Sequence, residues 1–308
     1  MEVQFYGVRG SIPTPPSNGI LREKVIDVLE KATPEDLQDD RSRESLVDEH
    51  FLPYAGGNSS CVRVHAEESP IIICDAGSGI RPAGLDIMGE EGKEICIFIS
   101  HTHWDHIMGF PFFVPAYAKG YNIKVFGCHP EMEKRFQYQQ TDTHFPITLD
   151  MMASNIEFVQ MKPGESVLVG ETKVTPVAQE HPGDSFSYVF ENKGKKLIYA
   201  TDSSYEYLGE MKTGENLYTG ADAFIFDAMY SFGDYIDRLD WGHSSSLFGA
   251  DFCASEDIKR LVLFHHEPQY DDKTLSKLAR KTKKHIKNNH PDVEVEVVLA
   301  VEGERLRL

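Results

Sequence analysis

The residues HTHWDH at positions 101–106 place three imidazoles and one carboxylate within six positions, a composition suited to metal binding. Alternate side chains of an extended segment point to the same side, so His101 and His103 can bind one cation together. Asp105 and His106 follow where the chain turns towards a helix, and they can face a second cation. Because clustered ionisable groups need solvent, partners or a metal, the spacing predicts a metal site.

A site for two metals needs further ligands from elsewhere in the chain. The candidates are His181, in a polar loop, and Asp202 and His265, which follow short apolar runs. His266 competes with His265, because alternation cannot decide which imidazole points inward where a strand ends. Imidazole and carboxylate ligands suit zinc first, and manganese, iron and cobalt also bind such donors. The sequence therefore predicts two divalent metal ions.

Short apolar runs are expected to position these residues as buried strands of an α/β protein. The runs lie at 71–74, 95–99, 197–200, 223–226 and 261–264. The polar residues that follow them are Asp75, His101 with His103, Asp202, Asp227 and His265. Open α/β sheets present reactive groups beyond their strand ends, so we expect these side chains at one edge. More polar alternation at 172–178 and 293–299 predicts two half-exposed strands.

Helices are predicted at 245–254 and 274–287, in an outer layer. A helical insertion is expected at about 17–52, where the apolar stripe consists of Leu21, Val25, Val28 and Leu29. This insertion is either a solvated excursion or a lid or oligomer contact near the site. We expect the rest of the 308 residues to form one domain around it.

The composition of the chain indicates which binding partners and which cellular compartment to expect. The formal net charge of -18 disfavours binding of structured nucleic acid, which needs a broad cationic surface. The five cysteines have no CxxC spacing, which favours buried, reduced thiols. The chain begins without a basic and apolar leader and contains no run long enough to span a bilayer, so we expect a cytoplasmic protein without membrane contact. The sequence does not decide the oligomeric state, and a homo-oligomer is one possibility.

Four further motifs accompany the ligand pattern: GVRGSIP at 7–13, GGNSSC at 56–61, WGHSS at 241–245 and FHHEP at 264–268. With the order HxHxDH, His, Asp and His, the chain resembles the metallo-β-lactamase superfamily, and within it the ribonuclease Z-like and cyclic-nucleotide phosphodiesterase-like branch. The resemblance covers nearly the whole chain. It implies an α/β fold with four layers, an αββα sandwich.

The resemblance also implies ligand roles. One metal would bind to His101, His103 and His181, and the other to Asp105, His106 and His265, with Asp202 bridging. His265 is favoured over His266 on the same ground. Trp104 stands where di-iron relatives that handle oxygen carry a carboxylate, which favours hydrolysis over redox chemistry.

The expected catalytic residues are Asp105 and His243. His243 is expected to act as general acid, since imidazole can protonate a leaving alkoxide near neutral pH. Its alternative role is a helix-start residue bonded to Ser245 or to backbone. Asp75 and Asp227 are expected to orient ligand imidazoles. The predicted substrate contacts are Asn58, Ser60, Ser244 and His266, and Arg9 is a weaker candidate.

Several aromatic residues near the metal motif have two interpretations. They form either a wall on which a substrate ring stacks or part of the core. The residues are Trp104, Phe110, Phe112, Phe113 and Tyr117.

The substrate is predicted to be a small, cyclic or otherwise compact phosphodiester. Only twenty residues separate His181 from Asp202, which is short for the tRNA-gripping arm implied by a likeness to ribonuclease Z. A ribonuclease Z-like endonuclease that processes RNA 3′ ends is the first alternative. A metal-binding sensor or scaffold without turnover is the second.

Overall fold

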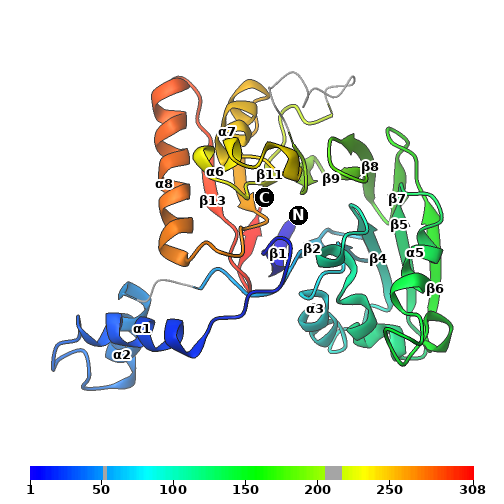
Figure 1. The fold of residues 1–308 in the computed structure, drawn as a ribbon, viewed down its shortest axis with the longest axis horizontal. Helices are drawn as coiled ribbons and strands as arrows, with labels where there is room; N and C mark the ends of the chain where they lie inside the picture. The colour runs from blue at the N-terminus through cyan, green and yellow to red at the C-terminus, as the bar shows by residue number, and fades with distance from the viewer. Residues whose placement is uncertain (51–53, 205–216) are drawn as a thin grey trace.

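Two mixed β-sheets pack face to face in the computed structural model, which describes residues 1–50, 54–204 and 217–308 (Figure 1). The first sheet has the order β14-β1-β2-β3-β4-β5-β6, with β1 (Glu2–Gly7), β2 (Cys61–His65), β3 (Ile71–Cys74), β4 (Glu94–Ile99), β5 (Asn122–Gly127), β6 (Asn155–Gln160) and β14 (Arg305–Arg307). The second has the order β13-β12-β11-β10-β9-β8-β7, with β7 (Val167–Val169), β8 (Thr172–Gln179), β9 (Ser185–Asn192), β10 (Lys195–Ala200), β11 (Ala223–Asp227), β12 (Arg260–Phe264) and β13 (Glu296–Leu299).

Helices cover the outer face of each sheet. The α-helices among the described residues are α1 (Asn18–Leu29), α2 (Asp40–His50), α3 (Ile80–Ile87), α4 (Trp104–Ile107), α5 (Met132–Gln139), α6 (Phe232–Ile236), α7 (Ser246–Ser255) and α8 (Asp272–Asn289), of which α3, α5, α7 and α8 form these outer layers. One apolar cluster joins the two sheets, a second joins the first sheet to α3 and α5, and a third joins the second sheet to α7 and α8. The predicted αββα sandwich is therefore confirmed.

The central strands are apolar on both faces because they lie between the other sheet and a helical layer. β3 pairs in parallel with β4, and β11 pairs in parallel with both β10 and β12. All five predicted buried strands are present, and β3 has the predicted limits. The carboxyl ends of each parallel group consequently meet at one edge of its sheet.

Three residues that follow these strands adopt left-handed backbone conformations. The φ angles are 59° at Asp75, 51° at Asp202 and 58° at His265. Such angles are uncommon outside glycine and persist where the surrounding structure over-determines them, often at functional sites. The chain therefore turns sharply after β3, β10 and β12, and each turn fixes the direction of one polar side chain.

The predicted insertion contains α1 and α2, which extend away from the sandwich (Figure 1). Within its apolar stripe only Val28 is buried, while Leu21, Val25 and Leu29 are 44%, 55% and 57% exposed. Lys24 connects α1 to the body through an ion pair of 2.7 Å with Asp272. A role as lid or oligomer contact stays a prediction.

All five cysteines are buried and unpaired, as their apolar surroundings predict. Among the described residues, none of the helices is both long enough and apolar enough to cross a bilayer. A cytoplasmic location stays a prediction.

Candidate metal centre

Three histidines form the first ligand set, at the edge where β4 and β8 end: His101, His103 and His181. Nε2 of His181 lies 3.2 Å from Nδ1 of His103. The ring centroids of His101 and His103 are 4.4 Å apart. One ligand atom from each residue lies within 4.8 Å of the other two, so the set can bind a single cation.

The second ligand set is buried beside the first and consists of Asp105, His106, Asp202 and His265. Nε2 of His106 and Nε2 of His265 each lie 3.1 Å from Oδ2 of Asp202. The same two nitrogens lie 3.1 and 3.2 Å from Oδ2 of Asp105. The other oxygen of Asp202, Oδ1, faces the first set, 3.7 Å from Nε2 of His101. Asp202 therefore presents one oxygen to each set.

The two sets fit divalent cations chemically. Among the described residues, Nε2 of His101 and Nε2 of His106 have no hydrogen-bond partner although both are buried. Leaving a buried polar atom unpartnered is costly, and a cation bound by each set would satisfy these nitrogens. The imidazole and carboxylate donors are those preferred by zinc and accepted by other first-row metals.

Asp75 holds His106 in a single orientation. Its carboxylate accepts hydrogen bonds from Nδ1 of His106 and from the hydroxyl of Tyr199, both at 2.7 Å, and from the backbone and side chain of Ser100. Because an ionised carboxylate only accepts, Nδ1 of His106 carries a proton and Nε2 is the atom directed at the metal. The orienting role expected for Asp75 fits this geometry. Tyr199 was missed, although a buried tyrosine hydroxyl normally has a partner.

His243 is only 8% exposed and lines the cleft above both ligand sets. Its Nδ1 donates to Oδ2 of Asp227 at 2.9 Å. Backbone N–H groups of Ser203 and Met229 fix that carboxylate at 3.1 and 3.2 Å. The partner of His243 is therefore Asp227 rather than Ser245 or backbone, and Nε2 is the atom that can meet a substrate.

A family model described as the beta-lactamase superfamily domain matches residues 72–266, a segment that contains all seven candidate ligands. The chain belongs to the metallo-β-lactamase superfamily. Ribonuclease BN of Citrobacter koseri is 28% identical over 199 residues, which cover 62% of this chain and 63% of that protein. The match therefore spans less than two thirds of that relative.

Two solved structures share the fold of this metallo-β-lactamase superfamily member. Zinc-bound PqqB from Methylobacterium extorquens superposes with a TM-score of 0.66 at 15% identity, covering 100% of both chains. The short form of human tRNase Z superposes with a TM-score of 0.63 at 18% identity, covering 100% of this chain and 99% of the other.

The pKa shifts distinguish the first ligand set of this metallo-β-lactamase fold from His243, but they do not distinguish the second set. Burial opposes protonation of His106, yet the carboxylates of Asp105, Asp202 and Asp75 outweigh it and raise the pKa of His106 well above its ordinary value. Burial lowers the pKa of His101 well below its ordinary value and also lowers the pKa values of His103 and His181. Burial acts in the same direction on His243, but the Asp227 carboxylate outweighs it and raises the pKa of His243 to about 9. Neutral imidazoles bind metals, whereas a protonated imidazole can donate a proton.

The structure places His265, and not His266, among the side chains that could bind a cation. Nε2 of His266 donates to the carbonyl oxygen of Ala300 at 2.8 Å, and the ring is fully buried. His265 instead joins the second ligand set. His266 does not line the cleft, because its side chain fastens its own loop to the backbone at Ala300, so a substrate contact by His266 stays a prediction.

The other predicted substrate contacts are Ser60, Ser244 and Asn58, and they also lie away from the cleft. Ser60 and Ser244 are fully buried, and the hydroxyl of Ser244 donates to the carbonyl of Ser203. The Asn58 amide donates to Glu302, and its oxygen accepts from the Ser78 hydroxyl. None of these three side chains lines the cleft above the ligand sets, so a substrate contact by any of them stays a prediction.

Arg9 is likewise buried. Its guanidinium donates to the carbonyl oxygens of Gly56 and Tyr270, at 2.8 and 2.9 Å. It joins the amino-terminal motif to two other loops and does not line the cleft.

The aromatic residues near the metal motif divide between the two interpretations. Phe110 and Phe113 are fully buried in the core. Trp104 and Phe112 are 77% and 53% exposed, and Tyr117 donates its hydroxyl to the carbonyl of Pro111. The core interpretation therefore holds for Phe110 and Phe113, and only Trp104 and Phe112 remain candidates for a substrate wall.

Gly10 lies against the ring of His265. A Cβ at Gly10 would lie 2.6 Å from Cε1 and 2.7 Å from Nδ1 of His265, closer than real contacts allow. Gly10→Ala is expected to displace that imidazole and to lower the metal content from about two ions per chain to about one. Elemental analysis after dialysis measures this. Gly89→Ala, with its nearest neighbour at 3.4 Å, is the control, and equal metal contents in the two variants would contradict the expectation.

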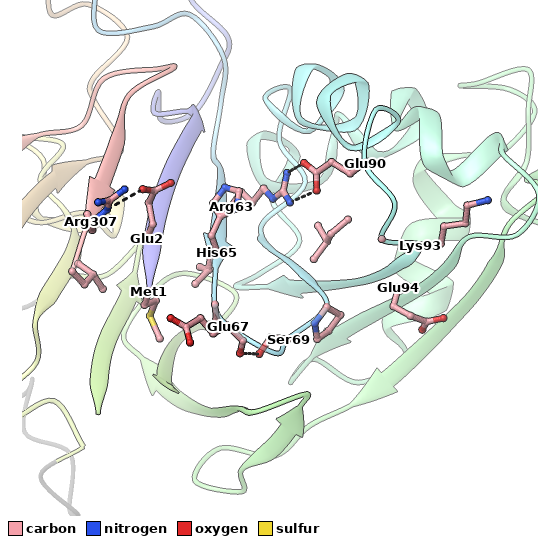
Figure 2. Close-up of a pocket in the computed structure, with 16 residues that line it drawn as sticks. Met1, Glu2, Arg63, His65, Glu67, Ser69, Glu90, Lys93, Glu94 and Arg307 are labelled. Atoms are coloured by element: carbon pink, nitrogen blue, oxygen red, sulfur yellow. Dashed lines mark hydrogen bonds and ion pairs between the residues drawn. The ribbon is translucent and has the colours of Figure 1, made fainter. Parts of the chain in front are cut away.

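A separate pocket of about 690 Å³ lies at the opposite edge of the first sheet (Figure 2). It includes Ile71 and Glu94, the first residues of β3 and β4, whereas the metal motif follows the other end of β4. Figure 2 shows Arg63 facing Glu90, with Nη1 and Oε1 2.5 Å apart. This pocket is therefore not part of the metal centre.

Proposed function

We propose that the protein is a binuclear metal-dependent phosphodiesterase that hydrolyses small phosphodiesters, cyclic ones included. The observation that carries the proposal is the pair of adjacent ligand sets, each faced by one oxygen of Asp202, with His243 held beside them by Asp227. The first set would hold one cation and the second set the other. Two bound divalent cations would neutralise charge on the phosphate and make a water nucleophilic for in-line attack.

Residues of the chain supply the remaining functions. The backbone N–H of Ser11 donates to Oδ2 of Asp105 at 2.7 Å and so fixes the direction of this candidate ligand. As the bond between phosphorus and the leaving oxygen breaks, that oxygen takes the proton from Nε2 of His243. Asp227 stabilises the protonated imidazole before the transfer and keeps its orientation afterwards.

The connection between His181 and Asp202 supports a small substrate. β9 and β10 fill it and are joined by Lys193 and Gly194, whose positive φ angles of 47° and 76° are typical of a tight hairpin. The connection between His181 and Asp202 therefore has no residues to spare for a protruding arm that could bind a folded RNA. The net charge of -18 also opposes extensive contact with phosphates.

A ribonuclease Z-like endonuclease is the second candidate, favoured by the similarity to ribonuclease BN. The deciding experiment assays the purified protein with zinc and with manganese on bis-p-nitrophenyl phosphate, cyclic AMP and a precursor tRNA. We expect hydrolysis of the first two. Cleavage of the tRNA at its 3′ side at physiological salt would establish the endonuclease instead, and no turnover on any diester would favour a metal-binding sensor.

A further inference from the structure

A further cluster of metal-binding side chains lies on the outer helical layer, where α7 packs beside α8 (Figure 1). It consists of Asp251 on α7, His285 in the last turn of α8 and His290, which caps that helix. α8 connects the end of β12 to the start of β13, and these strands are parallel, so its last turn lies at the sheet edge opposite the metal centre. Among the described residues, this is the one such cluster that shares no member with the metal centre.

Both imidazoles of the cluster point at the same oxygen atom. Nε2 of His285 lies 2.6 Å and Nε2 of His290 lies 2.8 Å from Oδ1 of Asp251. The two rings meet at an angle of 60°, with their centroids 6.4 Å apart. One imidazole is enough for an ion pair with a carboxylate, and exposed ion pairs contribute little to stability. Two imidazoles and a carboxylate that converge on one point are instead the donor set of a transition-metal site.

Packed helices hold the three side chains in place. Phe252 follows Asp251 and is only 1% exposed. Ile286 follows His285, is 5% exposed, and lies in the same apolar cluster as Phe252. The backbone N–H of His290 donates to the carbonyl oxygen of Ile286 at 2.8 Å, which fixes the end of the helix. Because the backbone is already ordered, a cation that binds here has little conformational entropy to offset.

We propose that Asp251, His285 and His290 form an accessory metal site, which takes zinc or another first-row transition metal and is separate from the hydrolytic centre. The two Nε2 atoms and Oδ1 are its protein ligands. The three side chains are 28%, 22% and 29% exposed, so water can complete the shell. Ligand atoms around a tetrahedral zinc lie about 3.3 Å apart, so each imidazole retreats by roughly half an ångström on binding.

Metal binding at Nε2 of His285 requires the proton of that ring to lie on Nδ1. The amide nitrogen of Asn289 lies 3.0 Å from this Nδ1. Asn289 is exposed, so its amide can rotate and present its oxygen to the protonated nitrogen. A cation bound in this way fastens the last turn of α8 to α7.

The accessory metal site should bind its ion more weakly than the metal centre does. It offers three half-exposed ligands, whereas the second ligand set of the metal centre is buried. Exposed lysines of α8, Lys284 and Lys287 among them, also repel a cation. Dialysis should therefore remove the accessory ion and leave the metal centre filled.

A calorimetric zinc titration of the dialysed protein at about pH 8, where imidazoles are neutral, tests the site. We expect one further ion to bind to the wild-type protein. Loss of an orienting partner alone costs about 10–100-fold in metal affinity, so Asp251→Asn and His290→Gln should each weaken this binding by about 100-fold or more. His144→Gln, an exposed histidine outside every cluster of the described residues, is the control that should bind like the wild type.

Two further readouts keep the accessory metal site separable from hydrolysis. Added zinc should raise the Tm of the dialysed wild-type protein more than that of Asp251→Asn, whereas magnesium, which prefers oxygen ligands, should act equally on both. Anomalous diffraction at the zinc edge should locate an ion between the three side chains. Zinc binding there without hydrolysis of any diester would overturn the phosphodiesterase and leave the accessory metal site standing. Unchanged zinc binding in both variants, or no further ion in the wild-type protein, would overturn the accessory metal site alone.

Discussion

Asp202→Asn is expected to abolish hydrolysis and to lower the metal content below two ions per chain. The substitution preserves shape but removes the charge that faces both ligand sets, at 3.1 Å from Nε2 of His106 and of His265. Metal ions supply several kcal/mol of transition-state stabilisation, so we expect a loss of about 10³-fold or more in kcat. Added zinc should also raise the Tm of the variant less than that of the wild-type protein, since weaker binding stabilises less.

Asp222→Asn is the matched control for this loss. Asp222 is also buried, at 6% exposure, but it precedes β11 and pairs with Lys259 at 2.7 Å at the opposite edge of the same sheet. Its replacement should lower Tm while leaving metal content and turnover per folded molecule unchanged. If Asp202→Asn retained two ions and wild-type activity, the metal centre would have to be reassigned.

His243→Gln is expected to discriminate between substrates by their leaving groups. Cyclic AMP releases an alkoxide that needs a proton, whereas p-nitrophenolate leaves without one. General acid catalysis is worth about 10²–10⁴-fold, so the variant should lose about that factor on cyclic AMP and far less on bis-p-nitrophenyl phosphate. His290→Gln, a half-exposed histidine paired with Asp251 outside the cleft, is the control.

The pH dependence gives an independent test of the same group. Asp227 raises the pKa of His243 to about 9 despite burial, so the imidazole is protonated below that pH and loses its proton above it. The rate of cyclic AMP hydrolysis should therefore decrease as the pH rises through the pKa of His243. This alkaline decrease should be absent in His243→Gln. If the alkaline decrease persisted in the variant, a group other than His243 would be responsible for it.

The buried strands and the polar residues that follow them could be predicted, because both are local features of the sequence. Ile71–Cys74 has the predicted bounds, and Asp75 follows it as expected. The choice between His265 and His266 could not be predicted from alternation, because it depends on the left-handed turn at His265. Where the pattern was silent, the likeness to known proteins favoured His265, which the structure places in the second candidate set.

Other parts of the site depend on contacts between residues distant in sequence. Tyr199 reaches Asp75 across 124 positions, and the carbonyl of Gly242 accepts from Nδ1 of His181 across 61. The predicted substrate contacts Asn58, Ser60, Ser244 and His266 do not line the cleft for a related reason. Residues such as Arg9 lie in distinctive motifs, but a distinctive motif can serve to hold loops together as well as to bind a ligand. The guanidinium of Arg9 bonds to the backbone of two other loops.

The distribution of the candidate ligands between the sheets has a consequence for how ions enter and leave. His101, His103, Asp105 and His106 follow a strand of the first sheet, whereas His181, Asp202 and His265 follow strands of the second. Ions held between them would link the two sheets, and a chelator should remove an ion from the partly exposed first set faster than one from the buried second set. During synthesis the second ligand set would stay incomplete until His265 has left the ribosome, whereas the first set is complete after His181.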